Sequence, residues 1–114
     1  MNKRIKKQWV ELLRSGEFEQ GRGHLEQDNK FCCLGVLCQI ALVEGACEFE
    51  VIQSVNSANI KYNRYDSHHV DETLSPHLLE WADLPAVDMD VLIELNDEHR
   101  ASFQEIADYI EKSL

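Results

Sequence analysis

The stretch that decides the fold is Phe31-Cys32-Cys33-Leu34-Gly35-Val36-Leu37-Cys38-Gln39-Ile40-Ala41-Leu42-Val43. Apart from Gly35 and Gln39 the stretch is apolar, so other segments must cover it on nearly every side. Its length, and the Glu44-Gly45 pair that follows, favour a helix from about 34 to 43 over a strand. A membrane span would need roughly 20 apolar residues. The stretch therefore predicts the buried central helix of a globular domain.

Glycines in and before this stretch predict close approaches of the backbone. Gly35 costs about 1 kcal/mol relative to alanine inside a helix, so we expect another backbone to pack against that turn. The earlier triplet Gly21-Arg22-Gly23 lacks the third glycine of a dinucleotide-binding loop and does not follow a buried strand. The triplet therefore predicts a tight backbone approach rather than such a loop.

The first third of the chain predicts a helix and a hairpin. Apolar residues at helical spacing indicate a helix over residues 3–15, with Gly16 as its left-handed stop. The polar stretch 17–33 predicts an irregular hairpin that turns near Asp28-Asn29 and leads into the central run.

The middle of the chain changes to an alternation of period two. Phe49 and Val51, followed by a turn signal at 56–59 and then Ile60 and Tyr62, predict a second hairpin.

Three further helices are predicted in the second half. Ser75 as cap and Pro76 as first residue open a short helix, and a second helix is expected over 88–95. The last helix is signalled by Ser102 and Glu105, which fit a capping box. The second helix is expected to carry its apolar face on Val91, Leu92 and Leu95.

Together these elements predict an α+β fold in a compact single domain over 1–114. We expect four or five helices around the central helix (about 34–43), with one or two small antiparallel β-hairpins at a side. A chain of 114 residues can bury such a core without metal or disulfide staples. No signal-peptide or lipidation pattern opens the chain, which predicts a cytoplasmic location and no membrane partner.

Charge is divided unevenly along the chain. Residues 1–65 carry 9 basic and 8 acidic side chains, whereas residues 66–114 carry 2 basic and 13 acidic ones. A surface made from the second half should repel nucleic acid and attract basic surfaces. The plainer alternative is a solvated surface that keeps the protein soluble. The first helix carries basic charge in its first turns, on Lys3, Arg4, Lys6 and Lys7. It is expected to contact an acidic partner, which includes the acidic half of this chain or of a second copy, or to be solvated.

Cysteine and histidine could in principle supply a metal site or a nucleophile. Adjacent Cys32 and Cys33 would point in different directions, which does not suit the paired ligands of structural zinc. His68 and His69 could hold a metal from a loop, but adjacent side chains on extended backbone face opposite ways. Cys32 with His24 is the only nucleophile pair worth considering. We therefore expect no metal and no cofactor, with buried, reduced thiols.

Several stretches together carry a resemblance to a known group of proteins. They are Arg14-Ser15-Gly16-Glu17-Phe18, Gln20-Gly21-Arg22-Gly23, Phe31 to Cys38, Leu95-Asn96-Asp97 and Ser102 to Glu111. In this order they resemble a family of small proteins encoded by bacteriophages, prophages and plasmids. The aromatic-Cys-Cys-Leu-Gly-Val-Leu-Cys run is the most specific of them. The resemblance implies an origin in a mobile element and a location in a bacterial host cell, and it carries over no catalytic residue.

These observations predict an accessory protein that is not an enzyme and that binds a host or phage macromolecule, a protein partner, through an acidic surface. DNA mimicry is one form that such binding could take. The alternative is a small enzyme or ligand- or metal-binding domain that uses the polar segment 20–32 with His68 and His69. The residues expected to bind the partner are Asp88, Asp90, Glu94, Asp97, Glu98, Glu105, Asp108 and Glu111.

Overall fold

The computed structural model describes residues 1–53, 61–65 and 72–114. The elements along the chain are α1 (Lys3–Ser15), β1 (Glu19–Gln20), β2 (Glu26–Gln27), β3 (Lys30–Phe31), α2 (Cys33–Val43), β4 (Phe49–Gln53), β5 (Lys61–Tyr65), α3 (Pro76–Ala82), α4 (Ala86–Asp97) and α5 (Phe103–Ser113). The predicted α+β class is confirmed, and the described residues form five helices, of which four surround the buried central helix α2. Within the described residues no helix is long and apolar enough to cross a membrane.

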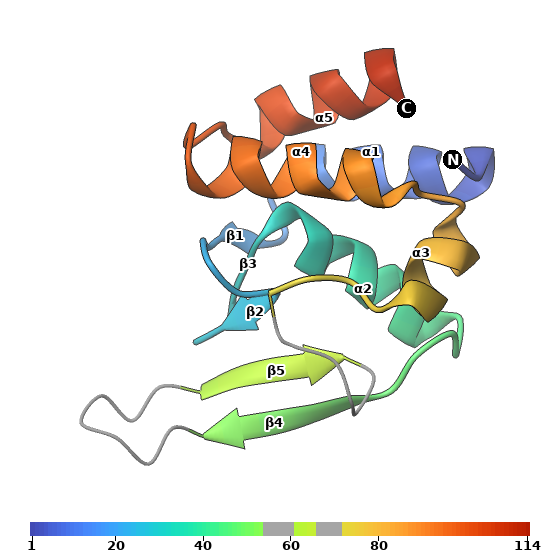
Figure 1. The fold of residues 1–114 in the computed structure, drawn as a ribbon. Helices are drawn as coiled ribbons and strands as arrows, with labels where there is room; N and C mark the ends of the chain where they lie inside the picture. The colour runs from blue at the N-terminus through green and yellow to red at the C-terminus, as the bar shows by residue number, and fades with distance from the viewer. Residues whose placement is uncertain (54–60, 66–71) are drawn as a thin grey trace.

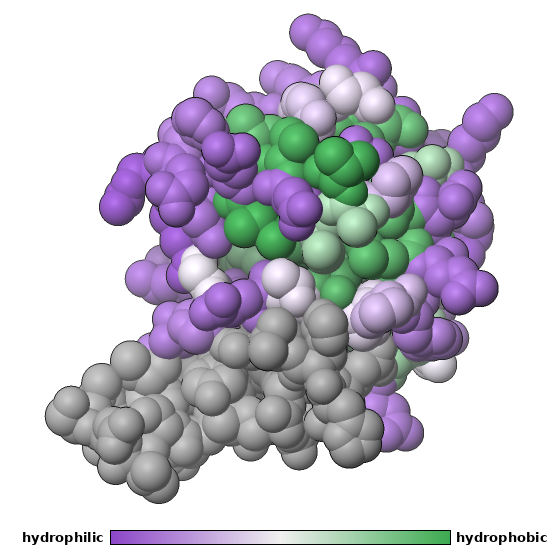
Figure 2. All heavy atoms as spheres, viewed as in Figure 1, coloured by the Kyte–Doolittle hydropathy of each residue, from purple (hydrophilic) through white to green (hydrophobic). Residues whose placement is uncertain are grey.

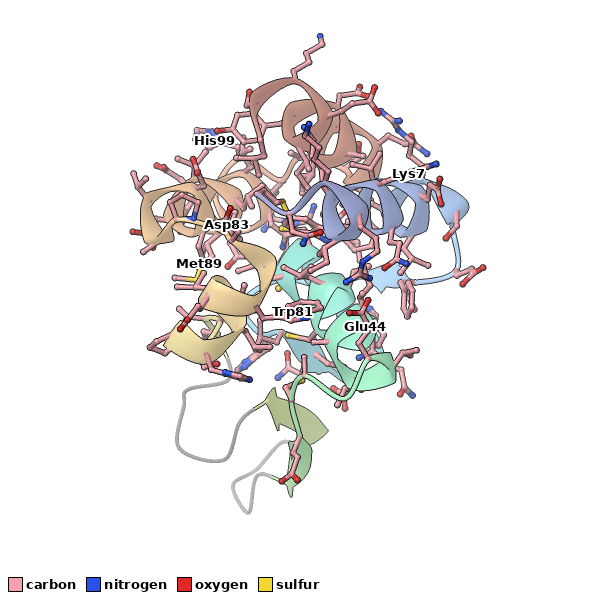
Figure 3. All side chains as sticks on the ribbon, turned by 90° about the vertical axis from the view of Figure 1, so that its right-hand side faces the viewer. Lys7, Glu44, Trp81, Asp83, Met89 and His99 are labelled. Carbon is pink, nitrogen blue, oxygen red and sulfur yellow. The ribbon has the colours of Figure 1, made fainter. Side chains whose placement is uncertain are left out.

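The central helix α2 lies between a layer of helices and a sheet (Figure 1). Helices α1, α4 and α5 form the layer on one side of it, strands β4 and β5 lie on the other side, and β1 and β3 lie beside its start (Figure 1, Figure 3). Most of α2 is buried, including Leu34 at 0% and Leu37 at 1% exposure. A buried hydrogen bond of 2.9 Å from Trp9 Nε1 to the carbonyl oxygen of Cys33 fixes α1 on α2. The apolar run at residues 31–43 therefore forms the core, as predicted.

The two predicted hairpins belong to one sheet. Its strand order is β1-β3-β2-β5-β4, with β1 and β3 parallel and the other pairs antiparallel. Asp28 and Asn29 form the two-residue turn between β2 and β3 with φ values of 52° and 63°, the backbone that a tight hairpin requires. The predicted turn at 56–59 lies outside the described residues. The pairing of β2 with β5, which joins the hairpins, was not predicted.

Both predicted backbone approaches are confirmed. A Cβ on Gly35 would lie 1.8 Å from the carbonyl oxygen of Leu25, and a Cβ on Gly21 would lie 2.8 Å from the Cβ of Lys30. Each glycine is therefore required by the contact that its missing side chain allows. Through the contact at Gly35 the segment between β1 and β3 lies directly against α2.

The helix boundaries follow the capping signals closely. Gly16 adopts φ +77° after α1, Ser75 caps α3 through the backbone N–H of Leu78, and Ser102 and Glu105 form the predicted capping box of α5. Helix α4 is longer than expected, because it begins at Ala86 after Pro85 rather than at Asp88.

The predicted apolar face of α4 needs a correction. Leu92 is buried as predicted and the half-buried Leu95 packs against the core, but Val91 is only half-buried, and Met89 and Asn96 are buried although they were not predicted. Apolar residues on several sides of α4 made the inward side ambiguous, and the polar Asn96 turned out to be on it.

Candidate functional site

The acidic residues that were expected to bind a partner fall into separate structural groups. Those of α5 are already engaged within the chain. Arg14 Nη2 donates to Asp108 Oδ1 at 2.7 Å, and Arg14 Nη1 donates to Glu111 Oε2 at 2.8 Å. Glu105 Oε1 accepts from the backbone N–H of Ser102 at 3.1 Å as part of the capping box. The α5 carboxylates therefore bind the first helix and cap their own helix.

The arginines of α1 thus contact acidic groups of the same chain, which was one of the alternatives for the basic first helix. The hydrogen bonds that Arg14 donates to Asp108 and Glu111 raise the pKa of Arg14 above its ordinary value. Arg4 Nη2 likewise donates to Glu44 Oε1 at 3.1 Å, and this hydrogen bond lowers the pKa of Glu44. Glu44 also lies beside Trp81 (Figure 3).

Asp97 points inward and belongs to a buried polar network. Its Oδ1 accepts from the backbone N–H of Gly23 at 3.1 Å and from Asn96 Nδ2 at 2.8 Å. Two internal bonds hold this carboxylate, so Asp97 supports the fold rather than an open surface.

Asn96 is the centre of that network, and sequence reasoning missed it. Its side chain is 0% exposed. Asn96 Oδ1 accepts from the backbone N–H of Cys33 at 3.2 Å and from Gln20 Nε2 at 2.9 Å, while Asn96 Nδ2 donates to the carbonyl oxygen of Gly21 at 2.9 Å. One amide thus joins the end of α4 to the start of α2 and to the loop after β1. Its spacing of four from the buried Leu92 was the signal that could have identified it.

The remaining predicted acids lie on α4. Asp88 is half-buried at the flank, whereas Asp90, Glu94 and Glu98 are exposed, and none of the four has an ion pair or hydrogen-bond partner for its side chain among the described residues. Positions 90, 94 and 98 follow one another at spacings of four, so they form one line along the outer side of the helix, opposite the buried residues. We call Asp90, Glu94 and Glu98, with the neighbouring Val87 and Val91, the α4 stripe.

The stripe also has an apolar component. Val87 is 67% exposed, one of two large hydrophobic side chains that are largely exposed among the described residues. Figure 2, viewed from the α4 side, shows hydrophobic residues gathered over α4 and just below it, with hydrophilic residues around them. The surface therefore combines unpaired carboxylates with exposed apolar area.

A groove that the sequence did not predict lies between α1 and α2. It has a volume of about 660 Å³, and Leu12, Phe18 and Ile40 contribute apolar lining. Glu11 and Glu17 also line it. It is a second exposed surface with acidic and apolar character, separate from the predicted residues.

The cysteines do not form a reactive site. Cys32, Cys33 and Cys38 are buried and form no disulfide bond, as predicted. Burial raises the pKa of Cys32 to about 12 and raises that of Cys33 as well, so both thiols are protonated at neutral pH. A nucleophilic role for Cys32 with His24 is therefore disfavoured.

Metal ligation has no support in the part of the chain that the structure describes. No group of three or more histidine, cysteine or acidic side chains there is arranged to hold a metal ion. His68 and His69 lie outside the described residues.

The comparison with protein families matches the whole chain, residues 1–114, to the family described as Domain of unknown function (DUF8296). The chain belongs to this family. No curated protein and no solved structure matches it.

In this DUF8296 protein, three of the stretches that carry the resemblance meet at one point. Gln20-Gly21-Arg22-Gly23, the start of the Phe31 to Cys38 run and Leu95-Asn96-Asp97 all contribute atoms to the network around Asn96. Every polar atom of the Asn96 side chain is hydrogen-bonded within the chain. A structural role in holding the fold together therefore accounts for these residues. The acidic stripe has no such explanation.

Proposed function

We propose that this DUF8296 protein is an accessory protein of a mobile genetic element and acts by binding a partner protein with a basic surface through the α4 stripe. The link to a mobile element rests on the sequence resemblance. The binding role rests on one observation: Asp90, Glu94 and Glu98 are aligned on one helix face without a basic partner in the described residues.

The alignment of three carboxylates on one face lowers the stability of the helix. Like charges at a spacing of four destabilise a helix by about 0.2–0.5 kcal/mol per pair, and the stripe contains two such pairs. A lysine at any of these positions would relieve the repulsion and add a favourable pair. Three carboxylates at a stability cost are expected where a partner supplies the positive charge.

The spacing of the carboxylates also indicates how the basic side chains of the partner should be arranged. Successive carboxylates are four residues apart, about 6 Å along the axis, so the partner should present lysine or arginine side chains at a similar spacing. Val87 and Val91 add apolar contact area beside the charges, which favours a protein over nucleic acid or a membrane surface. We favour the stripe over the groove between α1 and α2 because Glu44, which also lines the groove, is already paired with Arg4.

The test is capture of partners from host lysate with tagged protein at low and high salt. The stripe variant carries Asp90→Lys, Glu94→Lys and Glu98→Lys. The control carries Glu48→Lys, Glu72→Lys and Glu80→Lys, three exposed acids elsewhere, so both variants have the same net charge. We expect a basic partner that wild type and control retain, that the stripe variant loses, and that dissociates at high salt because screening weakens exposed charge pairs.

Two results would contradict the proposal. One is capture of the same proteins by wild type and stripe variant. The other is binding that is lost equally in both variants, because net charge rather than the stripe would then be responsible. Circular dichroism of the variants shows whether each is folded before its binding is interpreted.

A further inference from the structure

A small pocket lies on the segment that runs from the loop after β1 to the start of β3. It has a volume of about 180 Å³ and is lined by Gly21, Arg22, His24, Gln27, Asp28 and Lys30. Arg22 and Lys30 are two of only 11 basic residues in a chain of net charge −10, and Asp28 offsets one of their charges. The pocket therefore keeps a net positive charge in a strongly acidic protein.

Arg22 differs from the other arginines for which the structure gives contacts. Arg4 and Arg14 are each paired with carboxylates. Arg22 has no ion pair or hydrogen bond among the described residues, and its Nε is buried without a hydrogen-bond partner there. A guanidinium is always charged, and a buried donor that is left without a partner destabilises the folded protein. The Nε itself is shielded from solvent, but Arg22 also lines the pocket, so its charge can be balanced there by an external anion.

The backbone around the pocket is firmly held. Gly21 N donates to the carbonyl oxygen of Phe31 at 2.7 Å, and the carbonyl oxygen of Gly21 accepts from Asn96. Gly23 N is bonded to Asp97. The close contact between Gly21 and Lys30 sets the distance between the two parts of the pocket. The site is thus preorganised, which lowers the entropic cost of binding a ligand.

We infer that this pocket binds a phosphate group, held by the Arg22 guanidinium and the Lys30 ammonium. A planar guanidinium binds phosphate oxygens through two parallel hydrogen bonds, and an ammonium adds a point charge. The volume lies below the range of about 300–1,000 Å³ that holds drug-sized ligands, so the pocket takes an inorganic phosphate or the terminal phosphate of a larger molecule. This site depends on side chains and does not require the glycine pattern of a dinucleotide-binding loop.

The site is separate from the α4 stripe, so the two proposals can fail independently. Lys30 lies 3.8 Å from Glu19, but both side chains are more than half exposed and such pairs contribute little. Lys30 can therefore turn to an anion without a large loss elsewhere.

The experiment is a titration of isotope-labelled protein with inorganic phosphate, followed by NMR of backbone amides and of the Arg22 Nε–H group. Ionic strength is kept constant with sodium chloride. Separate titrations with sulfate and acetate distinguish a phosphate site from a general oxyanion or carboxylate site. We expect a saturable shift of the Arg22 Nε–H signal and of the Gly21 and Gly23 amides, with a Kd on the order of 1 mM.

Variants identify the side chains that bind. Arg22→Gln and Lys30→Gln are each expected to weaken phosphate binding about tenfold, because a charge-assisted hydrogen bond is lost. Lys112→Gln, which removes an exposed charge on α5, is the matched control and should bind as wild type does. The triple-lysine stripe variant should also still bind phosphate.

The inference is overturned if wild type shows no saturable shift, or if Lys30→Gln and Arg22→Gln bind phosphate as tightly as Lys112→Gln. Stronger binding of acetate than of phosphate would likewise overturn it, since the pocket would then be a carboxylate site. If Arg22→Gln does not fold, Lys30→Gln alone decides, because Lys30 is exposed and not required by the core.

Discussion

Helices α4 and α5 are neighbours in the chain and both carry several carboxylates, yet they use them differently. On α5 the acids bind Arg14 and cap the helix. On α4 the outward acids have no partner among the described residues, whereas the inward face carries the buried Asn96. Net charge per segment therefore does not identify a binding surface. What distinguishes the two helices is whether each carboxylate already has a partner.

The largest expected effects are losses of stability on replacing the residues that α4 and α5 bury in the core. Asn96→Ala should lower the free energy of unfolding by about 3–5 kcal/mol, because it leaves the buried N–H of Cys33 and carbonyl of Gly21 without their partner. Ile106→Ala on α5 should lower it by a similar amount, about 2–5 kcal/mol, through a cavity. Urea denaturation measures both.

Hydrogen exchange distinguishes the two mechanisms. The amides of Gly23 and Cys33 should lose protection in Asn96→Ala well before global unfolding, since the polar network holds the loop. In Ile106→Ala their protection should fall only with global stability. If these amides lose protection in the same way in both variants, Asn96 contributes to stability only as an ordinary core residue does.

An intermediate effect is expected at the start of α5. Ser102→Ala removes the side-chain acceptor for the N–H of Glu105 and should lower the free energy of unfolding by about 1 kcal/mol. Helix α4 has Pro85 at its cap and no side-chain cap. Pro85→Ala removes no capping hydrogen bond, so it should lower the free energy of unfolding by less than Ser102→Ala does. A thermal melt of both variants tests this difference, which disappears if the cap of α5 contributes nothing.

The parts of the fold set by local patterns were predictable from sequence. Helix starts at Ser75 and Ser102, the stop at Gly16 and the tight turn at Asp28-Asn29 depend on a few adjacent residues. The close approach at Gly35 was also predicted, because glycine inside an apolar helix needs a compensating contact.

Features that depend on distant residues were not predictable in this way. The pairing of β2 with β5 joins segments far apart in the chain, and two-residue strands are too short to show a periodicity. Among the predicted acids, Asp97 turned out to be internal and Asp108 to be paired, because their partners Gly23 and Arg14 lie more than 70 residues away. Which acids remain unpaired can be known only once the helices are placed.

The smallest expected effect tests the central difference between the two helices directly. Glu94→Gln removes the middle charge of the stripe and with it two repulsions at a spacing of four, from Asp90 and from Glu98. It should raise the free energy of unfolding by about 0.5 kcal/mol at low salt. Glu111→Gln on α5 removes the same charge from an ion pair with Arg14 and should lower stability instead. Paired urea titrations at low and at about 1 M salt measure both changes, and both should shrink at high salt because exposed charges are screened. If the two substitutions shift stability in the same direction, the carboxylates of α4 and α5 are equivalent, and the unpaired state of the stripe no longer supports a binding role.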